Sequence, residues 1–245
     1  MTEIRLCNTI RFPIEKALHI LIAGTTGSGK SVCMNLIINQ LIDHQPDCKA
    51  IFIDVKRVEL NQYKDLKQTI AYCNDIESAR HALNIAYRIM MNEYEYMESN
   101  GLKISDKMPL FVFVDEYADL VQQDRDIEKI IASIARLGRA ARVHLIIATQ
   151  YPTREIISTQ IKINLPVRIC FRLNRTGSIV VLDRTGAETL PGSGHAIMLY
   201  SDGQYYRFKS DILSESEIAA FIIRNKKQKQ KKKKFITGFS EWLTA

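Results

Sequence analysis

The stretch that decides the fold is Gly24-Thr25-Thr26-Gly27-Ser28-Gly29-Lys30-Ser31. It follows the pattern G-x-x-x-x-G-K-S of phosphate-binding P-loops. The residues before it, His19–Ala23, are largely apolar, and the residues after it, Val32–Leu41, form an amphipathic run. The loop therefore lies between an expected buried strand and an expected helix start, which is the setting that phosphate binding requires.

Each residue type in this loop has a chemical task. Glycines let successive backbone N–H groups turn toward phosphate oxygens, and the first turn of the helix adds unpaired N–H donors. Lys30 supplies a positive charge for the β- and γ-phosphates, and the hydroxyl of Ser31 is a ligand for Mg²⁺. We therefore expect ATP and Mg²⁺ as cofactors, with the nucleotide bound along Gly24–Ser31. A chance match in a glycine-containing turn is the alternative, and the strand-and-helix setting disfavours it.

Length, composition and charge narrow the class of protein. The chain has 245 residues, of which 46% are apolar, and this suits one large α/β domain. The formal net charge is +7, but seven lysines and no acid lie between Lys226 and Lys234, so the rest of the chain is formally neutral. We expect a folded domain at residues 1–224 and a lysine-rich tail at residues 225–245. The tail is either a solvated disordered run or an arm for DNA or an anionic membrane.

Cysteine usage and hydropathy indicate the compartment. Five cysteines are scattered without a C-x-x-C pair, at Cys7, Cys33, Cys48, Cys73 and Cys170. This distribution suits a reducing cytosol and argues against a disulfide framework or a zinc site. No apolar run approaches the ~18 residues of a membrane span, and no signal-peptide pattern is present. We expect a cytoplasmic protein; if it works at a membrane, a partner must hold it there.

Short apolar runs alternate with amphipathic ones along most of the chain. Strands are expected at residues 9–12, 18–23, 49–54, 69–73, 110–114, 143–148, 167–173, 196–199 and 205–208, and helices at residues 32–41, 75–99, 126–141 and 215–224. The last two strands flank the turn dipeptide Asp202-Gly203 and form an expected edge hairpin. This alternation predicts a doubly wound α/β sheet with functional residues at the carboxyl ends of its strands.

Two further strand ends carry polar residues. Asp115-Glu116 follows the apolar run Leu110–Val114 and has the form of a Walker B site, in which Asp115 holds Mg²⁺ and Glu116 orients or deprotonates water. Gln150 follows the expected strand at residues 143–148, where its amide is placed to sense the γ-phosphate or to align water. Each feature alone is compatible with an ordinary polar turn. The P-loop upstream favours the catalytic interpretation.

Three arginines lie close together in and after the expected helix at residues 126–141, namely Arg136, Arg139 and Arg142. One interpretation is a solvated helix face. The other is that one of them is an arginine finger, which stabilises transition-state charge at the nucleotide of a neighbouring subunit.

These motifs, in this order, resemble the motor domain of the FtsK/SpoIIIE DNA translocases, within the FtsK–HerA group of ring ATPases. The resemblance runs from about Leu18 to Leu199. It rests on HILIAGTTGSGKS at residues 19–31, IDVKRVEL at 53–60, VDEYADL at 114–120, GRAARVHLIIATQ at 138–150 and LDRTGAE at 182–188. It implies an α/β fold of the RecA-like P-loop NTPase type, with a mainly parallel central sheet flanked by helices.

The resemblance also implies an activity. Such motors are expected to form hexameric rings and to move double-stranded DNA by ATP hydrolysis, for DNA transfer, segregation or packaging. Arg139 is then the arginine-finger candidate, and a membrane-bound or recombination partner is compatible with the family. Contacts to the DNA backbone are expected in the loops after the strands at 143–148 and 167–173. The candidates for these contacts are Thr149, Tyr151, Arg172 and Arg175.

The sequence departs from the family pattern in several places. The family's T-Q-R-P is TQYP at residues 149–152, so one expected basic contact is missing, and its G-x-G-D-M is GSGHA at residues 192–196. The family's upstream domain, membrane segments and winged-helix module are not found. An ATPase motor of a conjugative or protein-secretion channel, moving protein or nucleoprotein, is therefore the alternative function. A binding module that uses ATP as a switch is disfavoured, because Asp115-Glu116 is intact.

Overall fold

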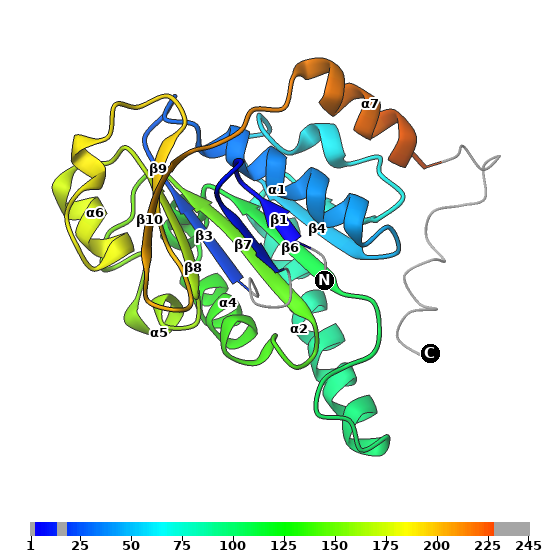
Figure 1. Cartoon of the computed structure of the whole chain (residues 1–245). Coiled ribbons are helices and arrows are strands. Elements are labelled where there is room, and N and C mark those ends of the chain that lie inside the picture. Colours follow the sequence, from blue (N-terminus) through cyan, green and yellow to red (C-terminus); the bar gives the residue numbers. More distant parts are fainter. Residues whose placement is uncertain (1–2, 14–18, 228–245) are drawn as a thin grey trace.

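A central sheet of eight strands positions every candidate site residue, and its strand order is β10-β9-β8-β3-β7-β6-β4-β5 (Figure 1). This computed structural model describes residues 3–13 and 19–227. The strands of the sheet are β3 (His19–Ala23), β4 (Lys49–Asp54), β5 (Thr69–Cys73), β6 (Leu110–Asp115), β7 (Val143–Thr149), β8 (Val167–Phe171), β9 (His195–Leu199) and β10 (Tyr205–Lys209). The first six run parallel, and β9 and β10 add the antiparallel edge hairpin that the sequence predicts.

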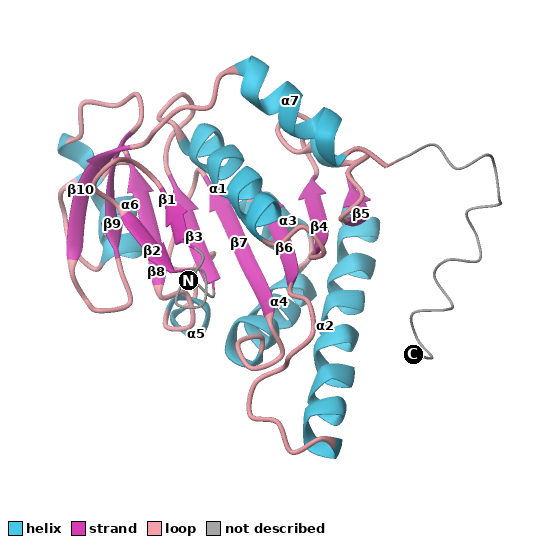
Figure 2. Ribbon diagram, turned by 45° about the vertical axis from the view of Figure 1, so that its right-hand side comes forward, coloured by secondary structure: helices cyan, strands magenta, loops and turns pink. Residues whose placement is uncertain are grey.

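Helices cover both faces of this sheet (Figure 2). They are α1 (Lys30–His44), α2 (Ile76–Ser99), α3 (Tyr117–Gln123), α4 (Arg125–Leu137), α5 (Thr159–Lys162), α6 (Arg175–Leu182) and α7 (Glu215–Asn225). Side chains of α1 and α7 pack into one apolar core, and side chains of α2, α3 and α4 pack into the core on the opposite face. The expected α/β fold with a mainly parallel sheet flanked by helices is confirmed.

The strand β6 shows why an apolar run predicts a central strand. Successive side chains of a strand point to opposite faces, so a strand covered by helices on both sides must be apolar at every position. Val112 and Val114 belong to the core beside α2, whereas Phe113 belongs to the core beside α1. There the ring of Phe113 stacks on that of Phe52 in β4 at 5.0 Å. Phe52 and Phe113 are partners in the parallel ladder of β4 and β6, and the same ladder places the ends of these two strands side by side.

Several element boundaries differ from those expected. The helix expected at residues 126–141 ends at Leu137. The N–H of Gly138 still bonds to the carbonyl of Ile134 (2.7 Å), but the carbonyl of Gly138 accepts the N–H of Val143 (2.9 Å) and not that of Arg142, which a continuing helix would use. The strand expected to reach residue 173 ends at Phe171. The short helices α3, α5 and α6 were not predicted, since elements this short show no clear periodicity. The hairpin of β1 (Glu3–Arg5) and β2 (Arg11–Pro13) was predicted only in its second strand.

The chain after α7 stays in contact with the body of the domain. A capping box formed by Ser214 and Glu217 starts α7. Lys226 pairs with Leu66 in a β-bridge, and the ammonium of Lys227 donates to the carbonyl of Thr69 at 2.8 Å. The first lysines of the expected tail thus lie on the folded domain, and residues 228–245 are outside the described residues. Within the described ranges, no helix has both the length and the apolar character needed to cross a membrane.

A buried histidine in β3 makes stability dependent on pH. His19 is 2% exposed, and its Nδ1 accepts the backbone N–H of Leu145 at 2.9 Å. Burial, aided by the nearby charge of His144, lowers the pKa of His19 from 6.5 to about 3. The unfolded chain therefore binds the proton first as the pH falls below 6.5, and the free energy of unfolding decreases with it. Between pH 7 and pH 5 we expect a loss of about 2 kcal/mol from this group.

Urea unfolding at pH 7, 6 and 5 measures this effect. His19→Gln is expected to be less stable at pH 7 but to lose less stability on acidification than the wild type. His44→Gln, which removes an exposed histidine of α1, is the matched control and is expected to follow the wild-type pH dependence. An unchanged pH slope in His19→Gln would contradict the assignment.

Candidate functional site

The P-loop joins β3 to α1 at the carboxyl edge of the sheet. Gly29 precedes the helix with φ 113°, no side chain caps the helix, and no acid lies in its first turn. The first N–H groups of α1 and the positive end of its dipole are therefore left for an anion. Thr25, Thr26 and Gly27 are exposed at the apex of the loop. The expected phosphate site thus has both its donors and an opening to solvent.

Close packing fixes the backbone of the loop. A Cβ atom added to Gly24 would lie 2.5 Å from Ser28 Oγ and 2.7 Å from Phe171 Cβ. One added to Gly29 would lie 2.9 Å from the Cα of Gly194, whose N–H donates to the carbonyl of Ser28 at 2.8 Å. The GSGHA segment that departs from the family pattern therefore supports the P-loop directly.

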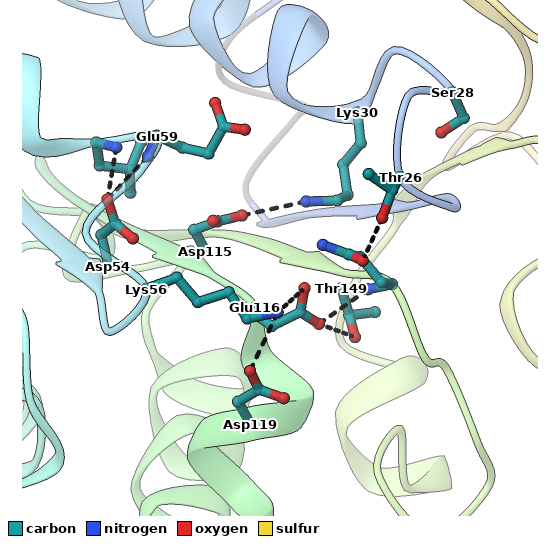
Figure 3. Close-up of polar contacts among 12 residues, drawn as sticks. Thr26, Ser28, Lys30, Asp54, Lys56, Glu59, Asp115, Glu116, Asp119 and Thr149 are labelled. Carbon is teal, nitrogen blue, oxygen red and sulfur yellow. Dashed lines mark hydrogen bonds and ion pairs between the residues drawn. The ribbon is translucent and has the colours of Figure 1, made fainter.

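Lys30 and Asp115 meet in the interior, as Figure 3 shows. Lys30 Nζ donates to Asp115 Oδ1 at 3.2 Å, and their side chains are 5% and 6% exposed. The P-loop and the expected Walker B site are thus brought together by the adjacent ends of β3, β7 and β6. The pair balances two buried charges, which would be costly apart.

The donor set around Asp115 fits Mg²⁺. This cation takes oxygen ligands and usually combines one or two carboxylates with phosphate and water. The carboxylate of Asp115 is already placed against a cation, and Ser31 lies beside Lys30 in the first turn of α1. No group of three or more His, Cys, Asp and Glu side chains that could hold a metal occurs in residues 3–13 or 19–227. The residues therefore fit a metal shared with a bound nucleotide, and a site made of protein ligands alone is not seen in these ranges.

Glu116 is held through both its backbone and its side chain. Its backbone has φ 55° in the left-handed region, and its side chain is fully buried. Its Oε1 accepts the N–H of Gln150 at 3.0 Å and lies 3.5 Å from the hydroxyl of Thr149, and its Oε2 lies 3.3 Å from Lys56 Nζ. A left-handed backbone costs a non-glycine residue about 1 kcal/mol, and such strain is concentrated at functional sites.

The P-loop is bonded to the ends of both flanking strands. At β7, the N–H of Gly24 donates to the carbonyl of Thr149 (3.2 Å), and the Thr26 hydroxyl donates to the side chain of Gln150 (2.9 Å; Figure 3). At β8, the N–H and the hydroxyl of Thr25 both donate to the carbonyl of Arg172, at 3.0 and 3.2 Å. Any change in this loop on nucleotide binding therefore acts on two strand ends.

The expected DNA contacts fall into two groups. Tyr151 is 65% exposed, and Arg172 and Arg175 are exposed beside the end of β8. Thr149 is fully buried and its hydroxyl faces Glu116, so the structure argues against the expectation that Thr149 touches DNA. At the last residue of β7, Thr149 lies beside Glu116 instead.

Arg139 and the P-loop lie at opposite ends of the strand β7. It is exposed in the turn that precedes β7, whereas the P-loop is bonded to the last residue of β7. A strand rises ~3.3 Å per residue, so the length of β7 separates Arg139 from its own nucleotide site. The neighbouring Arg142 is engaged inside the domain, where its guanidinium donates to the carbonyl of Lys107 at 2.8 Å.

Sequence reasoning missed three charged residues beside the site, namely Asp54, Lys56 and Asp119. Lys56 Nζ lies 3.2 Å from Asp119 as well as 3.3 Å from Glu116. The register of the sheet pairs Asp54, the last residue of β4, with Asp115 of β6. Functional residues are expected at the carboxyl ends of the strands of such a sheet. The same expectation holds for the carboxyl end of β4, and it would have indicated Asp54 and Lys56.

Comparison with known proteins identifies the family. A model of the FtsK/SpoIIIE family matches residues 3–107 and 94–154, more than half of the chain. The chain belongs to the FtsK/SpoIIIE family. The resemblance of the P-loop and Walker B motifs to FtsK/SpoIIIE proteins is thereby confirmed.

Individual relatives agree with this membership. The chain is 38% identical to the DNA translocase FtsK of Chlamydia trachomatis over 208 residues, which cover 74% of this chain and 26% of the relative. It is 34% identical to the DNA translocase SftA of Bacillus subtilis over 231 residues, covering 86% of this chain and 24% of that protein. The chain thus spans about a quarter of the length of these FtsK/SpoIIIE relatives.

Solved structures confirm the P-loop ATPase fold. The pCW3 conjugation coupling protein TcpA, determined with ATPγS, superposes with a TM-score of 0.79 at 26% identity, covering 89% of this chain and 67% of TcpA. The cytoplasmic domain of the Thermomonospora curvata type VII secretion ATPase EccC gives a TM-score of 0.71 at 21% identity, covering 86% of this chain and 28% of EccC. By sequence and fold, this FtsK/SpoIIIE chain is a P-loop ATPase.

Proposed function

We propose that this chain is the motor domain of a DNA translocase, which hydrolyses ATP to move double-stranded DNA through a ring of identical subunits. The observation that carries the proposal is the bonding of the P-loop to the ends of β7 and β8. These ends lead directly to the exposed residues Tyr151 and Arg172. The loop that binds phosphate and the two loops proposed to push DNA are therefore mechanically linked.

Each residue of the site has a proposed role in hydrolysis. Lys30 and the N–H groups of the P-loop bind the phosphates, while Asp115 and Ser31 would hold Mg²⁺, which neutralises phosphate charge when bound. The carboxylate of Glu116 accepts a proton from the attacking water. Gln150, already bonded to Thr26, reports the state of the nucleotide to the β7 loop.

The position of Arg139 supports self-association. Because Arg139 is exposed on the edge opposite to the P-loop, it is suited to reach the nucleotide of a neighbouring copy rather than its own. We propose that it stabilises transition-state charge there, in a ring that the family resemblance indicates to be hexameric. The five buried, free cysteines support a reducing cytoplasmic setting.

A second candidate function is the motor of a conjugative or secretion channel with protein or nucleoprotein cargo. The similarity to TcpA favours it, as does Tyr151, which stands where the family has a basic residue. This candidate keeps the ATPase roles above and changes only the cargo.

The rate of ATP hydrolysis with and without long duplex DNA tests the proposal. We expect duplex DNA of any sequence to stimulate hydrolysis several-fold, and we expect the stimulation to fade between roughly 50 and 200 mM salt, because phosphate contacts displace counterions. The double variant Arg172→Ala, Arg175→Ala is expected to need more DNA for the same stimulation. Arg88→Ala, which removes an exposed arginine of α2, is the matched control. A rate of ATP hydrolysis that duplex DNA leaves unchanged at every salt concentration would exclude duplex DNA as the cargo and favour the second candidate function.

A further inference from the structure

The turn that carries Arg139 lies between α4 and β7 and contains a strained residue. Two backbone bonds close the turn, from the N–H of Arg142 to the carbonyl of Arg139 (3.3 Å) and from the N–H of Val143 to the carbonyl of Gly138 (2.9 Å). Arg142 has φ 55° in the left-handed region, which costs a non-glycine residue about 1 kcal/mol. Such a conformation persists only where the surrounding structure holds it. The contacts around the turn therefore decide where Arg139 points.

The loop between α2 and β6 binds one side of this turn. The helix α2 extends past the sheet, and the chain then returns beside it to reach β6 (Figure 2). In this loop the N–H of Ser105 donates to the carbonyl of Ala140 at 2.9 Å. The guanidinium of Arg142 donates to the carbonyl of Lys107 at 2.8 Å. The loop thus fixes the chain that follows Arg139 at two points.

The hydroxyl of Ser105 sets the shape of this loop. It donates to Glu93 Oε1 at 2.6 Å, and its oxygen accepts the N–H of Lys107 at 3.0 Å. Ser105 and Glu93 are 5% and 8% exposed, so these bonds are shielded from water. Glu93 Oε2 also lies 3.5 Å from Lys107 Nζ. One hydroxyl therefore sets the relative position of the two groups of the loop that bind the Arg139 turn.

Tyr94 holds the chain that precedes the turn. Its hydroxyl donates to the carbonyl of Leu137 at 2.8 Å. Leu137 is the last residue of α4, and the last four carbonyls of a helix have no partner within that helix. Glu93 and Tyr94 are consecutive in α2, so one short stretch of this helix supports the chain on both sides of Arg139.

We infer that Tyr94 and Ser105 are positioning residues for Arg139: their hydroxyls hold its turn in the conformation from which Arg139 reaches the nucleotide of a neighbouring copy. This inference rests on the proposed function, in which Arg139 stabilises transition-state charge in a neighbour. The side chain of Arg139 is exposed, so its alignment depends on the backbone that carries it. Alignment matters because a displacement of about 1 Å can lower a catalysed rate by roughly a hundredfold.

Variants that each remove one hydroxyl test the inference. For Tyr94→Phe and for Ser105→Ala we expect kcat of ATP hydrolysis to fall by about tenfold. We expect KM for ATP to change little, because the P-loop lies at the other end of β7. The matched controls make the same substitutions elsewhere in α2, as Tyr87→Phe, about two turns before Tyr94, and Ser99→Ala, at the exposed end of the helix. Both controls are expected to keep the wild-type kcat.

Mixed rings separate a positioning role from a general loss of structure. A Tyr94→Phe subunit keeps its own nucleotide site, and a Glu116→Gln neighbour can give it a well-placed Arg139. Mixtures of these two variants are therefore expected to hydrolyse ATP faster than either variant alone. Mixtures of Tyr94→Phe with Arg139→Ala are expected to show no gain, because neither variant donates a well-placed arginine. Ser105→Ala is expected to give the same two results.

Amide hydrogen exchange gives a readout that needs no turnover. We expect the amides of residues 105–107 and 138–142 to exchange faster in Tyr94→Phe and Ser105→Ala than in the wild type. The exchange of residues 24–31, which form the P-loop, is expected to stay unchanged.

The outcomes distinguish this inference from the proposed function. A wild-type kcat in Arg139→Ala would overturn the proposed arginine finger and this inference together. A low kcat in Arg139→Ala, beside a wild-type kcat in Tyr94→Phe and Ser105→Ala, would overturn the role of these two residues alone. So would unchanged exchange at residues 138–142, or the absence of a gain with Glu116→Gln under conditions in which Arg139→Ala shows one.

Discussion

Replacing Lys30 with alanine is expected to abolish ATP turnover, lowering it by a factor on the order of 10³ or more. The ammonium of Lys30 is buried beside Asp115 at the start of α1, so no other described side chain is seen to take its place at the phosphates. Release of inorganic phosphate measures turnover, and titration with a fluorescent ATP analogue measures binding. We expect both to be lost.

The control for this variant must separate chemistry from folding. Lys30→Ala leaves the buried carboxylate of Asp115 without its partner, which lowers stability by itself. The double variant Lys30→Ala, Asp115→Asn removes both charges and is expected to fold but to stay inactive, whereas Lys64→Ala is expected to keep wild-type turnover. Normal hydrolysis by folded Lys30→Ala would refute the P-loop assignment.

Glu116→Gln is expected to bind ATP with near wild-type affinity and to hydrolyse it about 10² to 10⁴ times more slowly. Glutamine keeps the shape of glutamate and can still accept the N–H of Gln150, but it cannot take a proton from water. Single-turnover hydrolysis and analogue binding measure the two effects separately. Equal loss of binding and hydrolysis would argue for a structural role of Glu116 instead.

Mixing this variant with Arg139→Ala tests where the arginine acts. In a mixed ring, a subunit with intact Glu116 can receive Arg139 from a Glu116→Gln neighbour, so mixtures are expected to be more active than either variant alone. Arg136→Ala, which removes an exposed arginine of α4, is the matched control and is expected to be active by itself. The absence of rescue at every mixing ratio would contradict a trans-acting Arg139.

Local sequence patterns predicted the P-loop and the Walker B site, because each of these two motifs is continuous in sequence. The Gly24–Ser31 loop and the apolar run before Asp115 each contain the information that sets their own structure. The contact of Lys56 with Glu116 could not be predicted in this way, since it depends on β4 lying beside β6 in the sheet. The contact of Thr149 with Glu116 likewise depends on β6 lying beside β7 in the sheet.

The opposite placement of Arg139 and the P-loop constrains the symmetry of any assembly that uses both. A two-fold dimer joins one surface patch to the same patch of its partner, so a dimer that uses both features needs a patch that reaches from one end of the strands to the other. A head-to-tail interface needs no such extended patch, because in it each copy gives its arginine to one neighbour and receives one from the other. Such an interface closes into a ring or extends into an open helix, and either arrangement gives the assembly a built-in rotational sense.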